Sequence, residues 1–145
     1  MTIATTAPLG ETAQILGVRY RLHNGFDLIE MSNRGIARSE LIKLAEYLAI
    51  SPGQLIRLLP ISERTVQRHG AAKPFSRAVS EQVIQIASVA ARGVAVFEDR
   101  DHFLYWLKQP CVALGNKVPL ELLNSRFGAD IVLDELGRIE HGVFA

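Results

Sequence analysis

Apolar residues recur along most of the chain at the spacing of an α-helix. Between residues 39 and 48, four of them stand at i, i+3, i+4 and i+7, in one stripe. They are Leu41, Leu44, Ala45 and Leu48. A longer stripe runs from residue 76 to residue 97, and the chain holds no sustained alternation of apolar and polar residues. The pattern therefore predicts an all-α fold.

Capping residues mark where the shorter helices begin and end. Ser51-Pro52-Gly53-Gln54 is typical of a capping box with proline at the first helical position, and it predicts a helix that runs to Leu59 and stops at Pro60. Ser62 is the expected N-cap of a second helix, which ends at His69-Gly70. Two short helices in this arrangement, with apolar contacts inside and polar side chains outside, predict a helix-turn-helix.

The remaining boundaries follow from the same capping and breaking signals. The other expected elements are a frayed segment over residues 1–10, a helix over 26–34 ended by Gly35, a helix capped by Ser39, a helix capped by Asp99, a helix begun by Pro119 and ended by Gly128, and a last helix from about Asp130 to Glu140.

The long helix predicted over residues 76–97 needs a broad apolar partner, either from this chain or from a second copy. We expect it to serve self-association, which would make the protein a homodimer. With this helix the chain divides into two predicted domains. Residues 1–75 form an N-terminal helix-turn-helix domain, and residues 76–145 form the long dimerisation helix followed by a small helical domain.

The net charge of the whole chain is less informative than the charges of its separate segments. The 145 residues carry 16 Lys+Arg against 15 Asp+Glu, a formal net charge of +1 that excludes a polybasic protein. Residues 34–77 hold eight cations against three anions, a net +5, whereas residues 110–145 hold three cations against five anions, a net −2. A basic segment that coincides with a helix-turn-helix is the footprint of phosphate binding.

The second helix of the pair is the expected reader of the DNA major groove. Arg64 and Arg68 suit guanine O6 and N7 or a phosphate, and Gln67 suits adenine. Ser51 and Gln54, at the start of the preceding helix, suit a phosphate.

The sequence lacks the residue patterns of a metal site, a disulfide, a cofactor site or a catalytic motif. Cys111 is the one cysteine and the four histidines are scattered, so we expect no metal site and no internal disulfide. No Gly-rich phosphate loop follows a strand and no GxSxG occurs, so we expect neither a cofactor nor an enzyme.

The first residues lack the pattern of a signal peptide, and no apolar stretch is long enough to cross a bilayer. We therefore expect a cytoplasmic protein with no membrane contact.

The last residues permit two interpretations. Phe144 follows the last predicted helix without a polar tail. It either folds back onto the core or inserts into a pocket of a partner, where a cation would hold the neighbouring carboxylate. The residues alone leave both open.

Three stretches, taken together, resemble a known family. They are Ile61 to Arg68 (ISERTVQR), Phe103 to Leu107 (FLYWL) followed by Pro110 and by Ala113-Leu114-Gly115, and Val118 to Leu123 (VPLELL) followed by Gly128 and by Leu136 to Gly142 (LGRIEHG). In this order they resemble the Xre/MbcA/ParS-type antitoxins over roughly residues 34–142. Two residues depart from the family pattern, because Val118 replaces the usual Thr and Pro60 replaces the usual turn Gly.

The resemblance implies the antitoxin of a type II toxin–antitoxin system, paired with a RES-domain toxin that depletes NAD⁺. The antitoxin would also bind the promoter of the shared operon, at an inverted repeat, as a homodimer and repressor. The resemblance adds Ser62 and Thr65 to the DNA contacts and assigns toxin contact to the last helix and tail. The toxin-binding residues would be Arg138, Glu140, His141, Gly142, Val143, Phe144 and Ala145.

We hypothesise that Glu140 and the terminal carboxylate occupy part of the cationic NAD⁺ site of the toxin. The alternative is a stand-alone dimeric helix-turn-helix repressor with no toxin partner, which would lack a RES-type gene beside its own.

Overall fold

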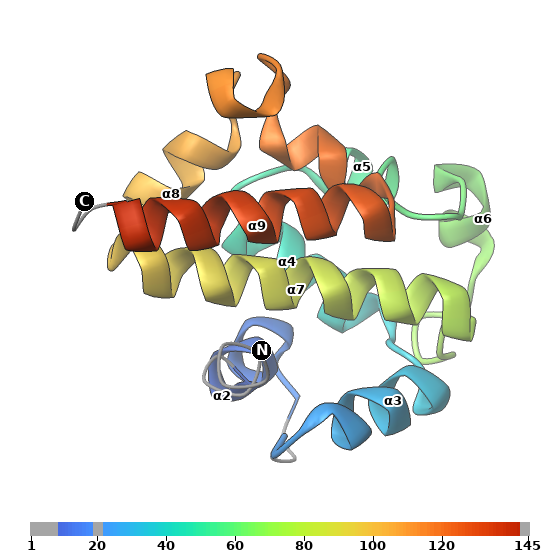
Figure 1. The fold of residues 1–145 in the computed structure, drawn as a ribbon. Coiled ribbons are helices and arrows are strands. Elements are labelled where there is room, and N and C mark those ends of the chain that lie inside the picture. The colour runs from blue at the N-terminus through green and yellow to red at the C-terminus, as the bar shows by residue number, and fades with distance from the viewer. Residues whose placement is uncertain (1–8, 19–21, 143–145) are drawn as a thin grey trace.

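Helix α7, from Arg77 to Phe97, runs through the middle of the computed structural model, which describes residues 9–18 and 22–142 (Figure 1). The other elements are α2 (Leu9–Leu16), α3 (Gly25–Arg34), α4 (Arg38–Tyr47), α5 (Pro52–Ile56), α6 (Glu63–Arg68), α8 (Arg100–Leu107), the 3₁₀ helices η1 (Val112–Leu114) and η2 (Pro119–Asn124), and α9 (Arg126–Gly142). Over the described residues no strand forms beyond one antiparallel bridge between Cys111 and Lys117, so the predicted all-α fold is confirmed.

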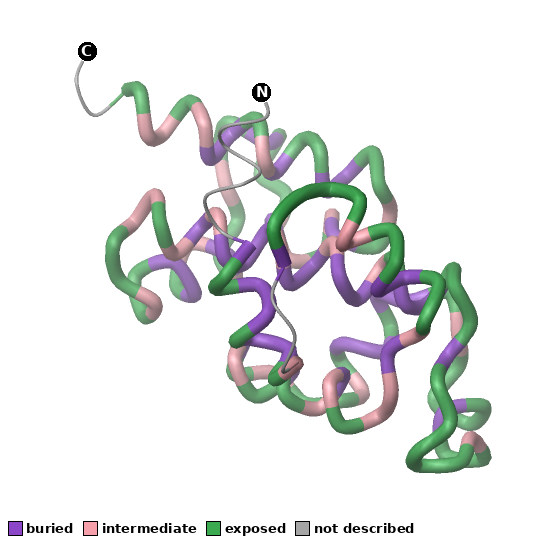
Figure 2. Tube along the Cα trace, turned by 90° about the horizontal axis from the view of Figure 1, so that it is seen from below, coloured by how far each residue is buried: buried purple, intermediate pink, exposed green. Residues whose placement is uncertain are grey.

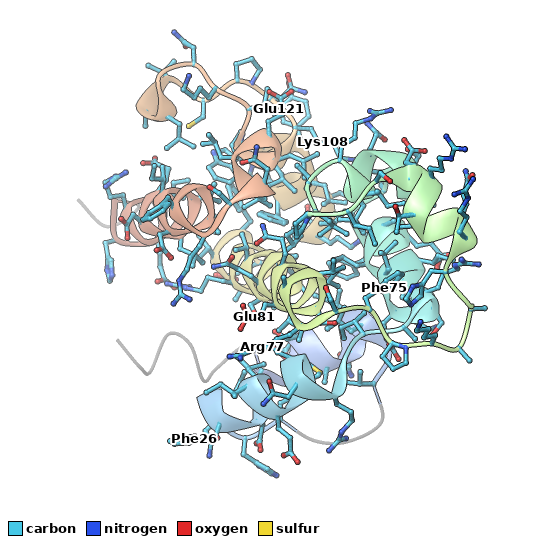
Figure 3. All side chains as sticks on the ribbon, turned by 90° about the vertical axis from the view of Figure 1, so that its right-hand side faces the viewer. Phe26, Phe75, Arg77, Glu81, Lys108 and Glu121 are labelled. Carbon is cyan, nitrogen blue, oxygen red and sulfur yellow. The ribbon has the colours of Figure 1, made fainter. Side chains whose placement is uncertain are left out.

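Neighbouring helices cover α7 on several sides. Figure 3 looks along its axis and shows α9 on one side and α3 and α4 on others, and α2 also packs against it. Within one turn, four of five residues are buried, and they are Val83, Ile84, Ile86 and Ala87. The apolar residues of the helix pack inside the chain, which favours the first of the two partners that the stripe left open, and self-association stays a prediction. Figure 2 shows the same separation, with buried positions inside and exposed positions on the outer turns.

Most predicted helix starts are confirmed by capping hydrogen bonds. The side chains of Ser51, Ser62, Ser76 and Asp99 each accept from a backbone amide three residues on. Helix α4 is an exception, since its N-cap is Ala37 rather than Ser39. There the Glu40 carboxylate accepts from the Ala37 amide at 2.7 Å, which is the half of a capping box that needs no side chain at the N-cap.

Helix α5 is shorter than predicted. Its last regular bond runs from the Arg57 amide to the Gly53 carbonyl, after which Leu58 and Leu59 donate to carbonyls only three residues back. The chain tightens into a 3₁₀-like turn before Pro60, so the α-helix ends at Ile56 rather than at Leu59.

Helix α2 was not predicted. Residues 9 and 10 belong to it, although they were expected to be frayed, and residues 1–8 lie outside the described residues. Leu9, Ala13 and Leu16 are buried at i, i+4 and i+7, which is the signal that could have revealed the helix.

Gly128 lies inside α9 and does not break a helix. Ser125 is the cap, because its hydroxyl accepts from the Gly128 amide at 3.1 Å, and the helix continues from Arg126 to Gly142. A Cβ at position 128 would overlap the carbonyl oxygen of Leu122, so glycine is required for η2 to lie against the start of α9. The breaker signal was wrong because the glycine serves a close backbone approach.

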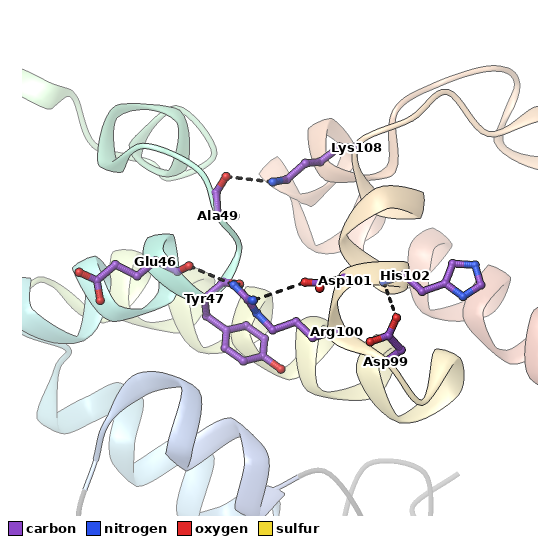
Figure 4. Close-up of polar contacts among 8 residues, drawn as sticks. All are labelled: Glu46, Tyr47, Ala49, Asp99, Arg100, Asp101, His102 and Lys108. Carbon is purple, nitrogen blue, oxygen red and sulfur yellow. Dashed lines mark hydrogen bonds and ion pairs between the residues drawn. The ribbon is translucent and has the colours of Figure 1, made fainter.

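Cations at the two ends of α8, Arg100 and the C-cap residue Lys108, join it to the carboxyl end of α4 (Figure 4). Arg100 donates to the Tyr47 carbonyl from Nε at 2.9 Å, and its guanidinium lies 5.0 Å from the centre of the Tyr47 ring. Lys108 donates to the Ala49 carbonyl at 2.9 Å, and burial together with Arg100 lowers the pKa of its ammonium. Positive charge at the carbonyl end of a helix opposes the helix dipole favourably and fixes α8 against α4.

None of the helices in residues 9–18 and 22–142 combines the length and apolar character needed to cross a bilayer.

We predict that Gly128→Ala destabilises the fold by about 3 kcal/mol, because the added methyl group meets backbone that cannot move aside. Gly137→Ala is the matched control on the same helix, since a Cβ there meets nothing within 4 Å. This control should gain up to about 1 kcal/mol from the better helix propensity of alanine. Urea unfolding of both variants measures the difference, and equal stability of the two would contradict the close approach.

Candidate functional site

Helices α5 and α6 lie next to each other and expose the predicted DNA-binding side chains. Both line one cleft together with α4, and the cleft is lined by Ile56 of α5, Val66 of α6 and Leu41 of α4. Val66 is the one buried residue of α6. The seven predicted residues are all exposed, and they are Ser51, Gln54, Ser62, Arg64, Thr65, Gln67 and Arg68. The structure therefore brings the whole predicted set to one region of the surface.

Four of these seven residues already cap helices. The Ser51 hydroxyl accepts from the Gln54 amide at 3.1 Å, and the Gln54 side chain accepts from the Ser51 amide at 2.9 Å. In the same way the Ser62 hydroxyl accepts from the Thr65 amide at 3.1 Å and lies 2.9 Å from the Thr65 hydroxyl. These contacts fix where each helix begins, and a phosphate contact by these side chains stays a prediction.

The other three residues have no partner within the described part of the chain. Arg64, Gln67 and Arg68 make no hydrogen bond or ion pair there, and all three project from α6. Exposed guanidinium and amide groups without intramolecular partners are the groups that read base edges or bind phosphates. Of the two helices α5 and α6, it is therefore α6 whose side chains are free to contact a partner.

The fold sorts the eight cations of the basic segment into two kinds. Arg34 pairs with Glu30 at 3.3 Å and Arg77 with Glu81 at 3.4 Å, while Arg38 bonds to backbone carbonyls. Lys43 of α4 is exposed, with its stem against Gly17, away from α6 along the chain. The remaining four, namely Arg57, Arg64, Arg68 and Lys73, are exposed on α6 and on the segments directly before and after it.

Sequence reasoning did not single out Arg57 and Lys73 as candidate contacts. Both are exposed, and they stand on either side of the α6 segment along the chain. The net charge of residues 34–77 includes both residues, but it does not show where they lie on the surface. With Arg64 and Arg68 they give this surface four cations, enough for several phosphate contacts.

The predicted partner-binding residues lie at the end of α9. Arg138 and His141 are exposed, and the Arg138 Nε donates to Glu135 at 2.8 Å. Gly142 is the last described residue, and Val143, Phe144 and Ala145 lie outside the described residues.

Glu140 already has a cation inside the chain. Both carboxylate oxygens accept from the Arg92 guanidinium of α7, at 2.6 and 3.3 Å, and the carboxyl side chain is 40% exposed. The hydrogen bond from Arg92 holds the pKa of the Glu140 carboxyl below its ordinary value, against a smaller opposite effect of burial. Glu140 therefore joins α9 to α7, and it would have to leave Arg92 to reach a cation of a partner.

The outer face of α9 was not predicted as a site. Phe127 is 83% exposed and Ile131 is 47% exposed, one helical turn apart. Asp130 and Asp134 are exposed beside them. We call these four residues the α9 outer face. The i, i+4 spacing of two large apolar residues on the polar side of a helix is the signal that could have revealed it.

Within residues 9–18 and 22–142, no three His, Cys, Asp or Glu side chains come close enough to hold a metal ion. The surfaces described above are open rather than enclosed, which suits macromolecular partners more than a small substrate.

Comparison with known proteins supports two functional regions in the same order. Residues 27–88 match the model of the antitoxin Xre-like helix-turn-helix domain, and residues 92–142 match that of the antitoxin Xre/MbcA/ParS C-terminal toxin-binding domain. The boundary after residue 75 stays a prediction, and α7 spans the junction between the two matches.

Three curated relatives are similar over most of the chain. An Antitoxin Xre of Photorhabdus laumondii is 28% identical over 122 residues, which cover 83% of this chain and 82% of the relative. An Antitoxin Xre of Yersinia enterocolitica is 27% identical and covers 83% of each chain. A Prs ADP-ribosylating antitoxin of Sphingobium sp. is 27% identical over 82% of this chain and 81% of its own.

We predict that Glu140→Gln lowers the melting temperature at neutral pH, because the bond to Arg92 loses its charge. A carboxyl with a depressed folded-state pKa stabilises the fold above its unfolded pKa, and this stabilisation is lost as pH falls through the folded pKa. The difference in melting temperature between wild type and variant should therefore shrink below the ordinary glutamate pKa of about 4.3. Thermal unfolding at pH 7 and pH 3 measures it, and a difference that is the same at both values would contradict the ion pair.

Proposed function

The chain belongs to the Xre/MbcA/ParS-type antitoxins, and from this we propose that it neutralises a RES-domain toxin and represses the operon that encodes both. It acts by binding and catalyses no reaction. One surface, on α5 and α6, meets promoter DNA, and a second, on α9 and the residues after it, meets the toxin.

The observation that carries the DNA part is the state of α6. Its arginines and glutamine are exposed and have no partner in the described part of the chain, and two more exposed cations flank the helix. In this proposal α6 enters the major groove, where Arg64 and Arg68 contact guanine or phosphate and Gln67 contacts adenine. Ser51, Gln54, Ser62 and Thr65 hold the two helices in register and contact the sugar-phosphate backbone.

We propose a homodimer as the repressing form. Two copies would present two α6 helices to an inverted repeat with half-sites about one helical turn of DNA apart. Because α7 is covered inside the chain, this dimer uses a surface other than α7.

The observation that carries the toxin part is the α9 outer face, which lies inside the region that matches the toxin-binding domain. Two exposed apolar side chains, Phe127 and Ile131, can be buried by a partner, and burial of such anchors dominates the free energy of binding. Asp130 and Asp134 beside them complement a toxin whose NAD⁺ site must attract phosphate groups.

The end of α9 and the tail complete the toxin contact in this proposal. Arg138 and His141 line the approach, and Gly142, Val143, Phe144 and Ala145 enter the active site of the toxin. Occlusion of an NAD⁺ site is compatible with the relative named Prs ADP-ribosylating antitoxin, since ADP-ribosylation also consumes NAD⁺.

Arg64→Ala with Arg68→Ala should weaken binding to the promoter of the operon at least tenfold, because each arginine contact to a base is worth about 1–3 kcal/mol. Lys117→Ala with Arg126→Ala is the matched control, since it also removes two exposed cations but from the region of α9. Gel shifts at moderate salt compare the two variants. Affinity that is unchanged in the first variant, or lost equally in both, would contradict the assignment to α6.

Phe127→Asp should abolish rescue of cells that express the toxin, and should weaken the purified complex at least tenfold, because truncation of a central anchor typically costs about 2 kcal/mol or more. Phe26→Asp is the matched control, since Phe26 is 79% exposed but lies on α3, outside the toxin-binding match. Removal of residues 142–145 should also abolish rescue while the fold is kept. Rescue by the Phe127 variant, or by the shortened chain, would show that the corresponding part of the proposed contact is wrong.

A further inference from the structure

We propose that Arg38 positions α6 for DNA, and that it does so by binding the carbonyl end of that helix instead of a phosphate. This inference rests on the proposed DNA-binding function of α6. It assigns a role to a residue that the charge pattern groups with the phosphate-binding cations.

Helix α6 needs such support because it has six residues. Helices this short are unstable on their own, since few backbone bonds form for the cost of nucleation. The Ser62 hydroxyl satisfies the amino end, and Val66 is the one side chain that α6 buries. The carboxyl end has no glycine cap, because His69 follows in an extended conformation with φ −76° and ψ 136°. Its last carbonyl groups therefore require other donors.

Arg38 supplies these donors. Its Nη2 atom donates to the carbonyl oxygens of both Val66 and His69, and these bonds are partly buried. A guanidinium at this place also opposes the negative end of the helix dipole. Because Arg38 is the first residue of α4, whose Leu41 and Leu44 lie in the core, the bonds fix α6 to the rigid part of the molecule.

The short segment between α3 and α4, which precedes Arg38, also holds the loop that follows α6. The His69 Nε2 lies 2.8 Å from the Lys73 carbonyl oxygen, and the ring stacks on Phe75 with centroids 4.4 Å apart. The Phe75 amide donates to the Ile36 carbonyl at 2.8 Å, and the Ile36 amide donates to the buried Ser80 hydroxyl of α7 at 2.8 Å. Ile36 and Arg38 thus hold α6 from two directions, one through the loop and one directly.

This geometry engages most of the Arg38 guanidinium inside the fold. Its Nη2 is shared between two carbonyl groups, and its Nε is buried without a partner in the described part of the chain. A positioning residue and a phosphate contact have different signatures in solution. Loss of a phosphate contact weakens every sequence alike and lowers the slope of log affinity against log salt by about one. Loss of a positioning residue misplaces the base contacts, so it weakens the operator selectively and leaves that slope unchanged.

The experiment compares Arg38→Met with wild type on a duplex from the promoter of the operon and on a scrambled duplex, over a series of salt concentrations. We expect operator affinity to fall at least about fivefold, with scrambled-DNA affinity within about twofold and the salt slope unchanged. A slope lowered by about one with uniform weakening, or operator affinity equal to wild type, would overturn the proposal. If Arg38→Met does not fold, Arg38→Lys replaces it, with the same slope expected and part of the operator preference lost.

A second readout uses the free protein and separates this proposal from the proposed function. Hydrogen exchange of peptides that cover residues 62–70 should accelerate severalfold in Arg38→Met, whereas peptides from α7 keep the wild-type rate. If wild type binds no promoter DNA, the proposed function fails and the exchange result alone decides the role of Arg38. Unchanged exchange over residues 62–70 would overturn that role.

Discussion

The burial of α7 on several sides is the constraint on which the rest of the structure depends. Alanines and Gly93 let neighbouring helices approach its axis, and the Phe103 ring of α8 occupies the space that a side chain at position 93 would fill. Each fully buried large apolar side chain contributes about 1.5–3 kcal/mol. Since α7 spans the junction between the two family matches, the helices of the helix-turn-helix match and those of the toxin-binding match are attached to one shared core.

Cations that bind backbone carbonyl groups attach the outer helices to this core. Arg38 binds the carboxyl end of α6, and Arg100 with Lys108 binds that of α4. Arg92 of α7 attaches α9 in a similar way, through its ion pair with Glu140. Three partly buried arginines that look like surface charge in the sequence are thus structural, and a bond to a charged group is worth about 1.5–3 kcal/mol when it is sheltered from water.

Local signals in the sequence predicted most of the helices, the exposed helix α6 among them, because caps act over three or four residues. The errors have tertiary causes. Gly128 has the pattern of a breaker, yet it serves the approach of η2 to α9, and no local signal distinguishes the two. The stripe of α7 likewise predicts that a partner is needed without saying that α2, α3 and α9 supply it. The exposed pair Phe127 and Ile131 was missed because the predicted break separated them.

The charge of a segment predicts a binding surface only through the cations that the fold leaves without partners. The net +5 of residues 34–77 includes Arg34 and Arg77, which have carboxylate partners, and Arg38, which has carbonyl partners. Apart from Lys43 of α4, the cations that remain lie on α6 and beside it, so the fold concentrates most of the available charge on less of the surface than the count implies. The same reasoning applies to α9, where Glu140 has Arg92 while Asp130 and Asp134 stay exposed. Opposite charges are therefore exposed at two separate surfaces of one core, which the formal net charge of +1 does not show.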